Sequence, residues 1–225
     1  MIFKIIAKDK KTNARLGILK TKSGAIETPF FMPVATKTAV KNISVEDLES
    51  IGARAIISNA FILSLKPGSE IIKKFGGIKK FMNYKGINFT DSGGFQMYSS
   101  TLYIGSNKKG VFFRNPFNGD NLFITPEKNM KIQLDIGSDV AMCLDSMPLI
   151  EHSKDAIADA VGKTTSWAEK CKSEHDKLQK NVKNEKRQLL FGIVQGGIHP
   201  DLRKKSAIEI SKIDLSENQN VEVTR

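Results

Sequence analysis

The sequence predicts an α/β protein built around a parallel sheet, either open or closed into a barrel. Short apolar runs alternate with segments of helical character along most of the chain. Several runs are apolar at nearly every position, as in parallel strands that are buried on both faces. In addition, three of the runs lead into Asp91, Asp145 or Gln195, which should place these polar side chains on one rim of the sheet.

About five barrel strands are expected, near residues 30, 55, 88, 141 and 191. The first should begin after Pro29 and end near Pro33, because proline donates no hydrogen bond to a strand ladder. A complete barrel of this class takes about 250 residues or more. If these strands belong to a barrel, we expect it to be incomplete with two open edges, either a truncated product or a half that needs a complementary chain.

Helices are expected between these strands. Ser44 is a good N-cap for a short helix that carries acids in its first turn and ends at Gly52. Thr125 and Pro126 begin another helix, as N-cap and first helical residue. The remaining predicted helices span residues 68–75, 153–179 and 200–210, and the helix after Thr125 runs to about residue 136.

Two predicted features lie outside this alternation. Residues 2–7 and 15–20 predict an N-terminal β-hairpin. Apolar residues 111–113 and 122–124, within a turn-rich stretch, predict a β-hairpin insertion. We expect residues 1–213 to form one domain and residues 214–225 to form a polar tail.

The net charge of +11 favours a polyanionic partner such as nucleic acid. The lysines that carry it are scattered, however, and a lysine-rich surface also serves solubility. Cys143 and Cys171 are not in a zinc-binding spacing, so reduced thiols are expected. The apolar N-terminus is too short for a signal sequence or a membrane span, and we expect a cytoplasmic protein with no membrane partner.

The chain is organised around residues 87–97, where an apolar run is followed by an acid, a hydroxyl, two glycines, an aromatic residue and an amide. At the carboxyl end of a strand, such a loop fixes the acid and lets a ligand approach backbone N–H groups closely. The alternative is a glycine turn with Asp91 as a solvated cap. Asp145 and Gln195, expected on the same rim, favour a functional site.

Ordered motifs between residues 28 and 213 resemble the tRNA-guanine transglycosylases, the base-exchange enzymes of queuosine and archaeosine biosynthesis. The motifs are residues 28–36, 58–60, 66–68, 90–96, Asp145 and 191–197. The resemblance implies a (β/α)8 barrel with a β-hairpin insertion. It also implies an enzyme that flips a guanine out of tRNA and replaces it with a 7-deazaguanine through a covalent glycosyl-enzyme intermediate.

The resemblance further implies roles for individual residues. Asp91 would be the acid/base group and Phe95 would stack on the purine. The purine edges would be read by Ser92, Gln96, Asp145, Gln195 and the amides near Gly196 and Gly197. Guanine presents adjacent N–H donors that a carboxylate accepts as a forked pair. Asn59 would help to orient a site carboxylate, while Phe95 as a core residue and Gln195 as a strand-end cap are the alternatives.

The later part of the sequence departs from the family pattern. We identify no counterpart of the family's Gly-rich substrate loop, nucleophilic aspartate or Cys-rich zinc site. Asp214 follows a predicted helix and is not assigned as the nucleophile. No cofactor or metal is expected in this chain, and the structural zinc is expected from a C-terminal region. Residues 146–148 favour the archaeal branch, whose incoming base is 7-cyano-7-deazaguanine.

Three functions are compatible with these patterns. The leading one is a tRNA-guanine transglycosylase, incomplete as this chain, with tRNA, a 7-deazaguanine base and either a complementary C-terminal chain or a second copy as partners. The second is a non-catalytic tRNA-binding or partner subunit, which the retained Asp91 disfavours. The third, a barrel enzyme acting on a phosphorylated metabolite, would need a phosphate loop after later strands.

Overall fold

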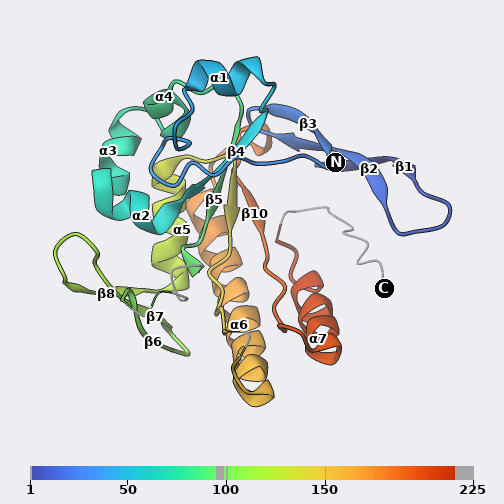
Figure 1. Ribbon diagram of the computed structural model, residues 1–225, viewed down its shortest axis with the longest axis vertical. Coiled ribbons are helices and arrows are strands. Elements are labelled where there is room, and N and C mark those ends of the chain that lie inside the picture. The colour runs from blue at the N-terminus through green and yellow to red at the C-terminus, as the bar shows by residue number, and fades with distance from the viewer. Residues whose placement is uncertain (1, 95–98, 100, 150, 216–225) are drawn as a thin grey trace.

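The parallel sheet predicted from the sequence is the centre of the fold in a computed structural model of the chain (Figure 1). The structure describes residues 2–94, 99, 101–149 and 151–215. The sheet has the order β10-β9-β5-β4, with β4 at Ala55–Asn59, β5 at Ile87–Asp91, β9 at Val140–Met142 and β10 at Leu189–Phe191. Within the described residues this sheet does not close on itself, so the α/β class is confirmed without a closed barrel.

The strand predicted between Pro29 and Pro33 is reduced to a single parallel bridge, which joins Val34 to Ile57. The amide of Ala35 donates to the carbonyl of Ile57, and the amide of Ile57 donates to the carbonyl of Pro33. The two prolines have no N–H group to extend this ladder. The five expected barrel strands are therefore four strands and one bridge.

Helices connect the strands, and their starts follow from their caps. They are α1 (Val45–Ser50), α2 (Ala60–Leu63), α3 (Ser69–Lys74), α4 (Ile78–Met82), α5 (Pro126–Ile136), α6 (Lys154–Leu178) and α7 (Pro200–Ser211), with the turns η1 (Ser64–Gly68) and η3 (Asn184–Lys186). Ser44 and Asp47 form a capping box at α1, and Thr125 caps α5. All the predicted helices are present, whereas the short α2 and α4 are additional.

The predicted N-terminal hairpin is part of a three-stranded antiparallel sheet, formed by β1 (Phe3–Lys8), β2 (Arg15–Thr21) and β3 (Gly24–Thr28). Strand β3 buries only Ile26, so its alternation of apolar and polar residues is too weak to predict a strand. Leu19 and Ile26 pack with Phe89 of the parallel sheet. The N-terminal sheet therefore covers part of one face of that sheet.

The predicted hairpin insertion also has a third strand. It consists of β6 (Tyr103–Asn107), β7 (Gly110–Arg114) and β8 (Asn121–Ile124). Gly105 resembles a turn residue in the sequence but lies at a register shift inside β6. The ring of Phe113 packs on that of Phe61 in α2, with 4.6 Å between the ring centroids. The indole N–H of Trp167 in α6 donates to the backbone carbonyl of Lys108 at 3.1 Å. The insertion is thus anchored on two helices.

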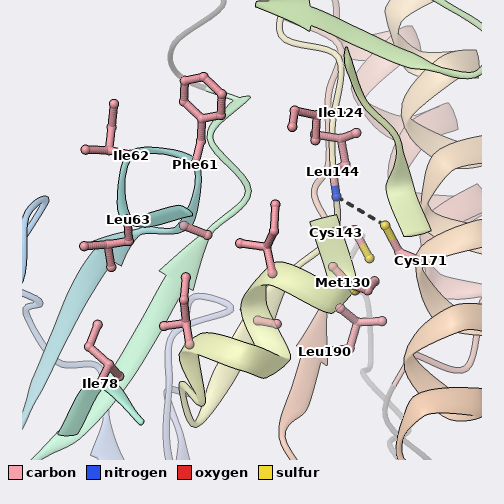
Figure 2. Packing of buried hydrophobic residues seen from close by; sticks show 14 of the residues in the cluster. Phe61, Ile62, Leu63, Ile78, Ile124, Met130, Cys143, Leu144, Cys171 and Leu190 are labelled. Carbon is pink, nitrogen blue, oxygen red and sulfur yellow. Dashed lines mark hydrogen bonds between the residues drawn. The ribbon is translucent and has the colours of Figure 1, made fainter. Parts of the chain in front are cut away.

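Alternate residues of the parallel strands pack into two different clusters, as the two-residue period of a strand requires. Ile56, Ala141 and Leu190 pack with the helices, whereas their strand neighbours pack on the other face around Phe89. Figure 2 shows Leu190 in the cluster on the helix side, together with residues of α5 and α6.

The helices cover the face of the parallel sheet that carries Ile56, Ala141 and Leu190, because their apolar side chains pack against it. Met130 of α5 and Cys171 of α6 are fully buried there, close to Cys143 and Leu144 (Figure 2). Both cysteines are free thiols, as expected. Among the described residues, no helix has the length and apolar character needed to cross a bilayer.

Candidate functional site

Asp91 is the last residue of β5 and lies on the same face of the strand as Phe89. Asn59, its register partner at the end of β4, donates its side-chain amide to Oδ2 of Asp91 at 3.2 Å. The backbone N–H of Gly93 donates to Oδ1 at 2.8 Å. Asn59 is itself fixed, since its Oδ1 accepts the N–H of Ile62 in the first turn of α2. The orienting contact expected of Asn59 is therefore present.

Burial raises the pKa of the Asp91 carboxyl to about 6. The hydrogen bonds from Gly93 and Asn59 lower it, but they offset only part of the cost of burial, and the charge of Asp145 raises it further. A carboxyl with such a pKa exchanges its proton close to neutral pH. That property is the one required of a general acid and base.

Asp145 is almost fully buried, at 5% exposure, and is held by two side-chain donors. The hydroxyl of Ser92 donates to Oδ1 at 2.9 Å, and the amide of Gln195 donates to Oδ2 at 2.7 Å. Burial raises the pKa of Asp145, and these two hydrogen bonds oppose that shift. The structure thus brings together residues from three distant parts of the chain.

The prediction that Asp145 and Gln195 end their strands is wrong. Strand β9 ends at Met142 and β10 ends at Phe191, so both residues lie in the loops that follow. The backbone N–H of Gln195 donates to the buried hydroxyl of Ser206 in α7 at 3.0 Å. A tertiary contact, rather than the strand ladder, therefore fixes the position of Gln195.

Gly93 and Gly94 require glycine for different structural reasons. Gly93 has φ +85°, a conformation that side chains disfavour. A Cβ atom on Gly94 would lie 2.4 Å from Oδ1 of Asp145, so Gly94 leaves the space that the carboxylate occupies. This close approach explains why a glycine pair follows the acidic strand end.

Gly196 and Gly197 also adopt positive φ angles, +127° and +54°. A Cβ atom on Gly196 would lie 2.5 Å from the backbone nitrogen of Arg203 in α7. Glycine therefore lets this loop lie against α7 while Gln195 reaches Asp145. The reading of a base by the amides near these glycines stays a prediction.

A family model described as queuine tRNA-ribosyltransferase matches residues 9–219 of the chain. The chain belongs to this family.

Relatives in this family are similar along most of the chain. The queuine tRNA-ribosyltransferases of Lysinibacillus sphaericus and Staphylococcus aureus are each 44% identical over 206 residues, which is 92% of this chain and 52% of the relative. The enzyme of that name from Anoxybacillus flavithermus is 45% identical over 213 residues, 95% of this chain and 54% of its own length. The chain spans about half the length of the curated relatives it matches. These relatives are bacterial and do not support the archaeal branch that residues 146–148 favoured.

Two further residues of this family member support the site from α5, and sequence reasoning missed both. The buried amide of Asn129 donates to the carbonyl of Ser92 at 2.8 Å, and the amide of Gln133 donates to Oδ1 of Asn129 at 2.5 Å. Their spacing of one helical turn was the available signal. Phe95 and Gln96, predicted to bind the purine, lie outside the described residues.

The described residues do not supply the structural zinc site that the family resemblance implies. Cys143 and Cys171 are both enclosed in the apolar core. No group of three or more His, Cys, Asp or Glu side chains in this part of the chain is placed to hold a metal.

Proposed function

We propose that the chain is the N-terminal part of a tRNA-guanine transglycosylase of the (β/α)8 type, which exchanges a genetically encoded guanine in tRNA for a 7-deazaguanine. The observation that carries this proposal is the pair of neighbouring carboxylates in unlike environments. Asp91 accepts from the backbone N–H of Gly93 and the amide of Asn59 and has a pKa of about 6, whereas two other side chains, Ser92 and Gln195, donate to the more deeply buried Asp145. Two carboxylates in different environments divide the work of proton transfer and binding.

Asp145 is suited to hold the base. After accepting one hydrogen bond on each oxygen, a carboxylate keeps further lone-pair directions free. These directions fit the adjacent N–H donors of guanine in a forked pair. A 7-deazaguanine keeps those donors, because it differs from guanine at position 7. One carboxylate therefore accommodates both the leaving and the entering base.

Asp91 is suited to carry the proton. Breaking the N-glycosidic bond gives the sugar oxocarbenium character and leaves negative charge on the purine. Protonated Asp91 gives its proton to the departing guanine, and ionised Asp91 takes a proton from the incoming base. The covalent intermediate requires a nucleophilic carboxylate as well. Asp214 is not assigned to this step, because it follows α7 rather than a strand.

The open edges of the parallel sheet support a partner for this chemistry. A barrel satisfies both edges by closure, so we propose that a complementary C-terminal chain, or a second copy, completes the site. On residues 146–148 alone, and against the bacterial origin of the relatives named above, we propose 7-cyano-7-deazaguanine as the incoming base. Competition between that base and queuine for incorporation tests this choice, and preferential use of queuine would reverse it.

Exchange of labelled guanine into tRNA tests the function. The chain is assayed alone and together with the segment of the Lysinibacillus relative that lies outside the match. We expect exchange in the mixture and none with Asp91→Ala, whose folding is checked by circular dichroism. Normal exchange by Asp91→Ala would overturn the role of Asp91. Salt-dependent tRNA binding without exchange, even in the mixture, would favour the non-catalytic tRNA-binding subunit.

A further inference from the structure

An aromatic and basic group lies outside the site of Asp91 and Asp145, in the loop between β7 and β8. Phe117 of this loop is 44% exposed. The Nζ atoms of Lys37 and Lys66 lie 5.9 and 5.5 Å from the centroid of its ring. Both lysines are exposed, and within the described part of the chain neither forms an ion pair.

Hydrogen bonds hold the loop that carries Phe117. The backbone N–H of Asn115 donates to the backbone carbonyl of Asp120 at 2.7 Å, and the N–H of Gly119 donates to the backbone carbonyl of Asn115 at 2.9 Å. The side chain of Asn115 accepts the N–H of Phe117 at 2.9 Å, and that of Asn118 accepts the N–H of Asp120 at 3.1 Å. The aromatic ring is therefore presented on a preorganised loop, which reduces the entropy lost on binding.

The three side chains come from segments that meet near the carboxyl ends of the strands. Lys37 follows the bridge to β4, and Lys66 lies in η1, which follows β4 and α2. The insertion itself follows β5 (Figure 1). The ring of Phe113 anchors it on Phe61 of α2. Because Phe61 comes directly after β4, the Phe117 group lies on the side of the molecule that carries the candidate site.

We propose that Phe117, Lys37 and Lys66 form an RNA-binding subsite on the side of the molecule that carries Asp91 and Asp145. In this subsite an unstacked base of the substrate RNA packs on Phe117, and the two ammonium groups bind adjoining phosphates. The proposal rests on the proposed function, since exchange requires RNA at this rim. Surfaces that bind single-stranded RNA combine aromatic platforms with basic side chains in this way.

The subsite would also serve base flipping. Extruding a guanine removes the stacking partner of the neighbouring nucleotides. An exposed aromatic ring on the same side of the molecule would replace part of that stacking. The lysines are available for phosphate, because their contact with an exposed ring is weak compared with an ion pair to a phosphate group.

Binding of in vitro transcribed tRNA to the full chain, measured by fluorescence anisotropy at several salt concentrations, tests the subsite. Phe117→Leu keeps an apolar side chain but removes the aromatic face, and should weaken binding roughly tenfold. Phe117→Tyr keeps the face and should bind normally. The double variant Lys37→Gln with Lys66→Gln should lower the slope of log Kd against log salt by about 1.4, since each phosphate contact to a single strand contributes about 0.7.

Matched controls separate the subsite from general effects. Phe75→Leu alters a phenylalanine that is 61% exposed but lies at the end of α3, and Lys10→Gln with Lys11→Gln removes two charges from the turn after β1. Neither should reproduce the loss. Thermal melting shows that each variant is folded.

The outcomes distinguish the subsite from the function on which it rests. Unchanged tRNA binding by Phe117→Leu overturns the subsite and leaves the proposed function standing. Weakening by the lysine variant alone overturns the stacking role, since nonspecific attraction then suffices. If the unsubstituted chain binds no tRNA, the subsite and the proposed RNA substrate fail together. Calorimetric guanine binding should persist in Phe117→Leu and disappear in Asp145→Asn.

Discussion

Asp91 is partly buried and Asp145 almost fully buried, and burial raises the pKa of both carboxyls, but their neighbours differ. Asp145 accepts from the side chains of Ser92 and Gln195, which stabilise its ionised form. Asp91 accepts the backbone N–H of Gly93 at 2.8 Å and the amide of Asn59 at 3.2 Å, but the charge of Asp145 acts against its ionised form, and its pKa of about 6 reflects burial above all. The same residue type thus supplies a fixed acceptor and a proton-exchanging group.

The raised pKa of Asp91 predicts a stability that depends on pH. The native carboxyl has a pKa of about 6 and the unfolded one 3.8, so between these values the native state binds more protons. The contribution of Asp91 is present below the unfolded pKa and is lost as the pH rises through the folded one. Asp91→Asn should therefore be more stable than the unsubstituted chain at about pH 7, by about 3 kcal/mol, and nearly equal to it at about pH 4.

Urea unfolding at the two pH values measures this difference. A stability gain of equal size at both would contradict the prediction, since it would come from packing rather than from ionisation. The expected loss of exchange in the same variant would show that Asp91 is retained for chemistry at the expense of stability.

The substitution Gly94→Ala should weaken base binding. The added Cβ atom would lie 2.4 Å from Oδ1 of Asp145 and must displace that carboxylate. Hydrogen bonds to charged groups contribute about 1.5–3 kcal/mol, so guanine should bind about tenfold more weakly or worse. Gly105→Ala is the matched control, because a Cβ atom there meets nothing within 4 Å. Calorimetry measures the affinity of both variants for guanine, and normal binding by Gly94→Ala would contradict this explanation.

For single residues, the sequence predicted that the polar residues which follow the apolar runs lie close together. Asp91, Ser92, Asp145 and Gln195 are brought together as expected. The supporting amide of Asn129 was not predicted, because an amide inside an amphipathic helix gains its role only from the helix face that meets the sheet. That orientation is a tertiary property.

At the scale of elements, β9 is a strand of three residues that depends on α5 for hydrogen bonds. Oε1 of Gln133 accepts the N–H of Met142 at 3.1 Å and the hydroxyl of Thr90 at 2.8 Å. Its Nε2 donates to the carbonyl of Met142 at 2.8 Å. One helix side chain thus continues the pairing of β9 where the strand ladder ends.

Gln133→Leu should therefore be strongly destabilising although the volume changes little. It leaves the N–H and C=O of Met142 without their partner in a partly buried place, and each such loss costs about 1–3 kcal/mol where the group is shielded from water. We expect the free energy of unfolding to fall by about 3 kcal/mol or more. Urea denaturation measures the change. A loss below about 1 kcal/mol would mean that water or Thr90 replaces the amide.

The elements that the sequence predicted share strong local signals. Ser44 and Thr125 mark helix starts through caps, and fully apolar runs mark buried strands. Strands β3 and β6 were missed because one buries a single residue and the other contains Gly105 at a register shift. Their pairing depends on neighbouring strands, which the local pattern does not contain.

At the scale of the whole molecule, apolar side chains gather where the parallel sheet is open. Beside the bridge, Phe31 and Val34 are 83% and 62% exposed and line an apolar groove of about 590 Å³. After β10, at the other edge, Val194 and Ile198 are 41% and 65% exposed. Open strand edges flanked by apolar groups are typical of surfaces that another chain covers.

A complementary C-terminal chain that closes a barrel must contact both edges at once. Mixing the chain with the unmatched segment of the Lysinibacillus relative should therefore raise its melting temperature, since binding at about 100 times Kd adds about 2.7 kcal/mol to stability. Val34→Lys should reduce this shift, because it places a charge at the edge that the partner must cover. Ile6→Lys alters a residue of β1 that is 53% exposed and away from this edge, and should leave the shift intact. Sedimentation of the chain alone distinguishes the two possible partners. If the chain forms a dimer without the added segment, and Val34→Lys disrupts that dimer, the partner is a second copy.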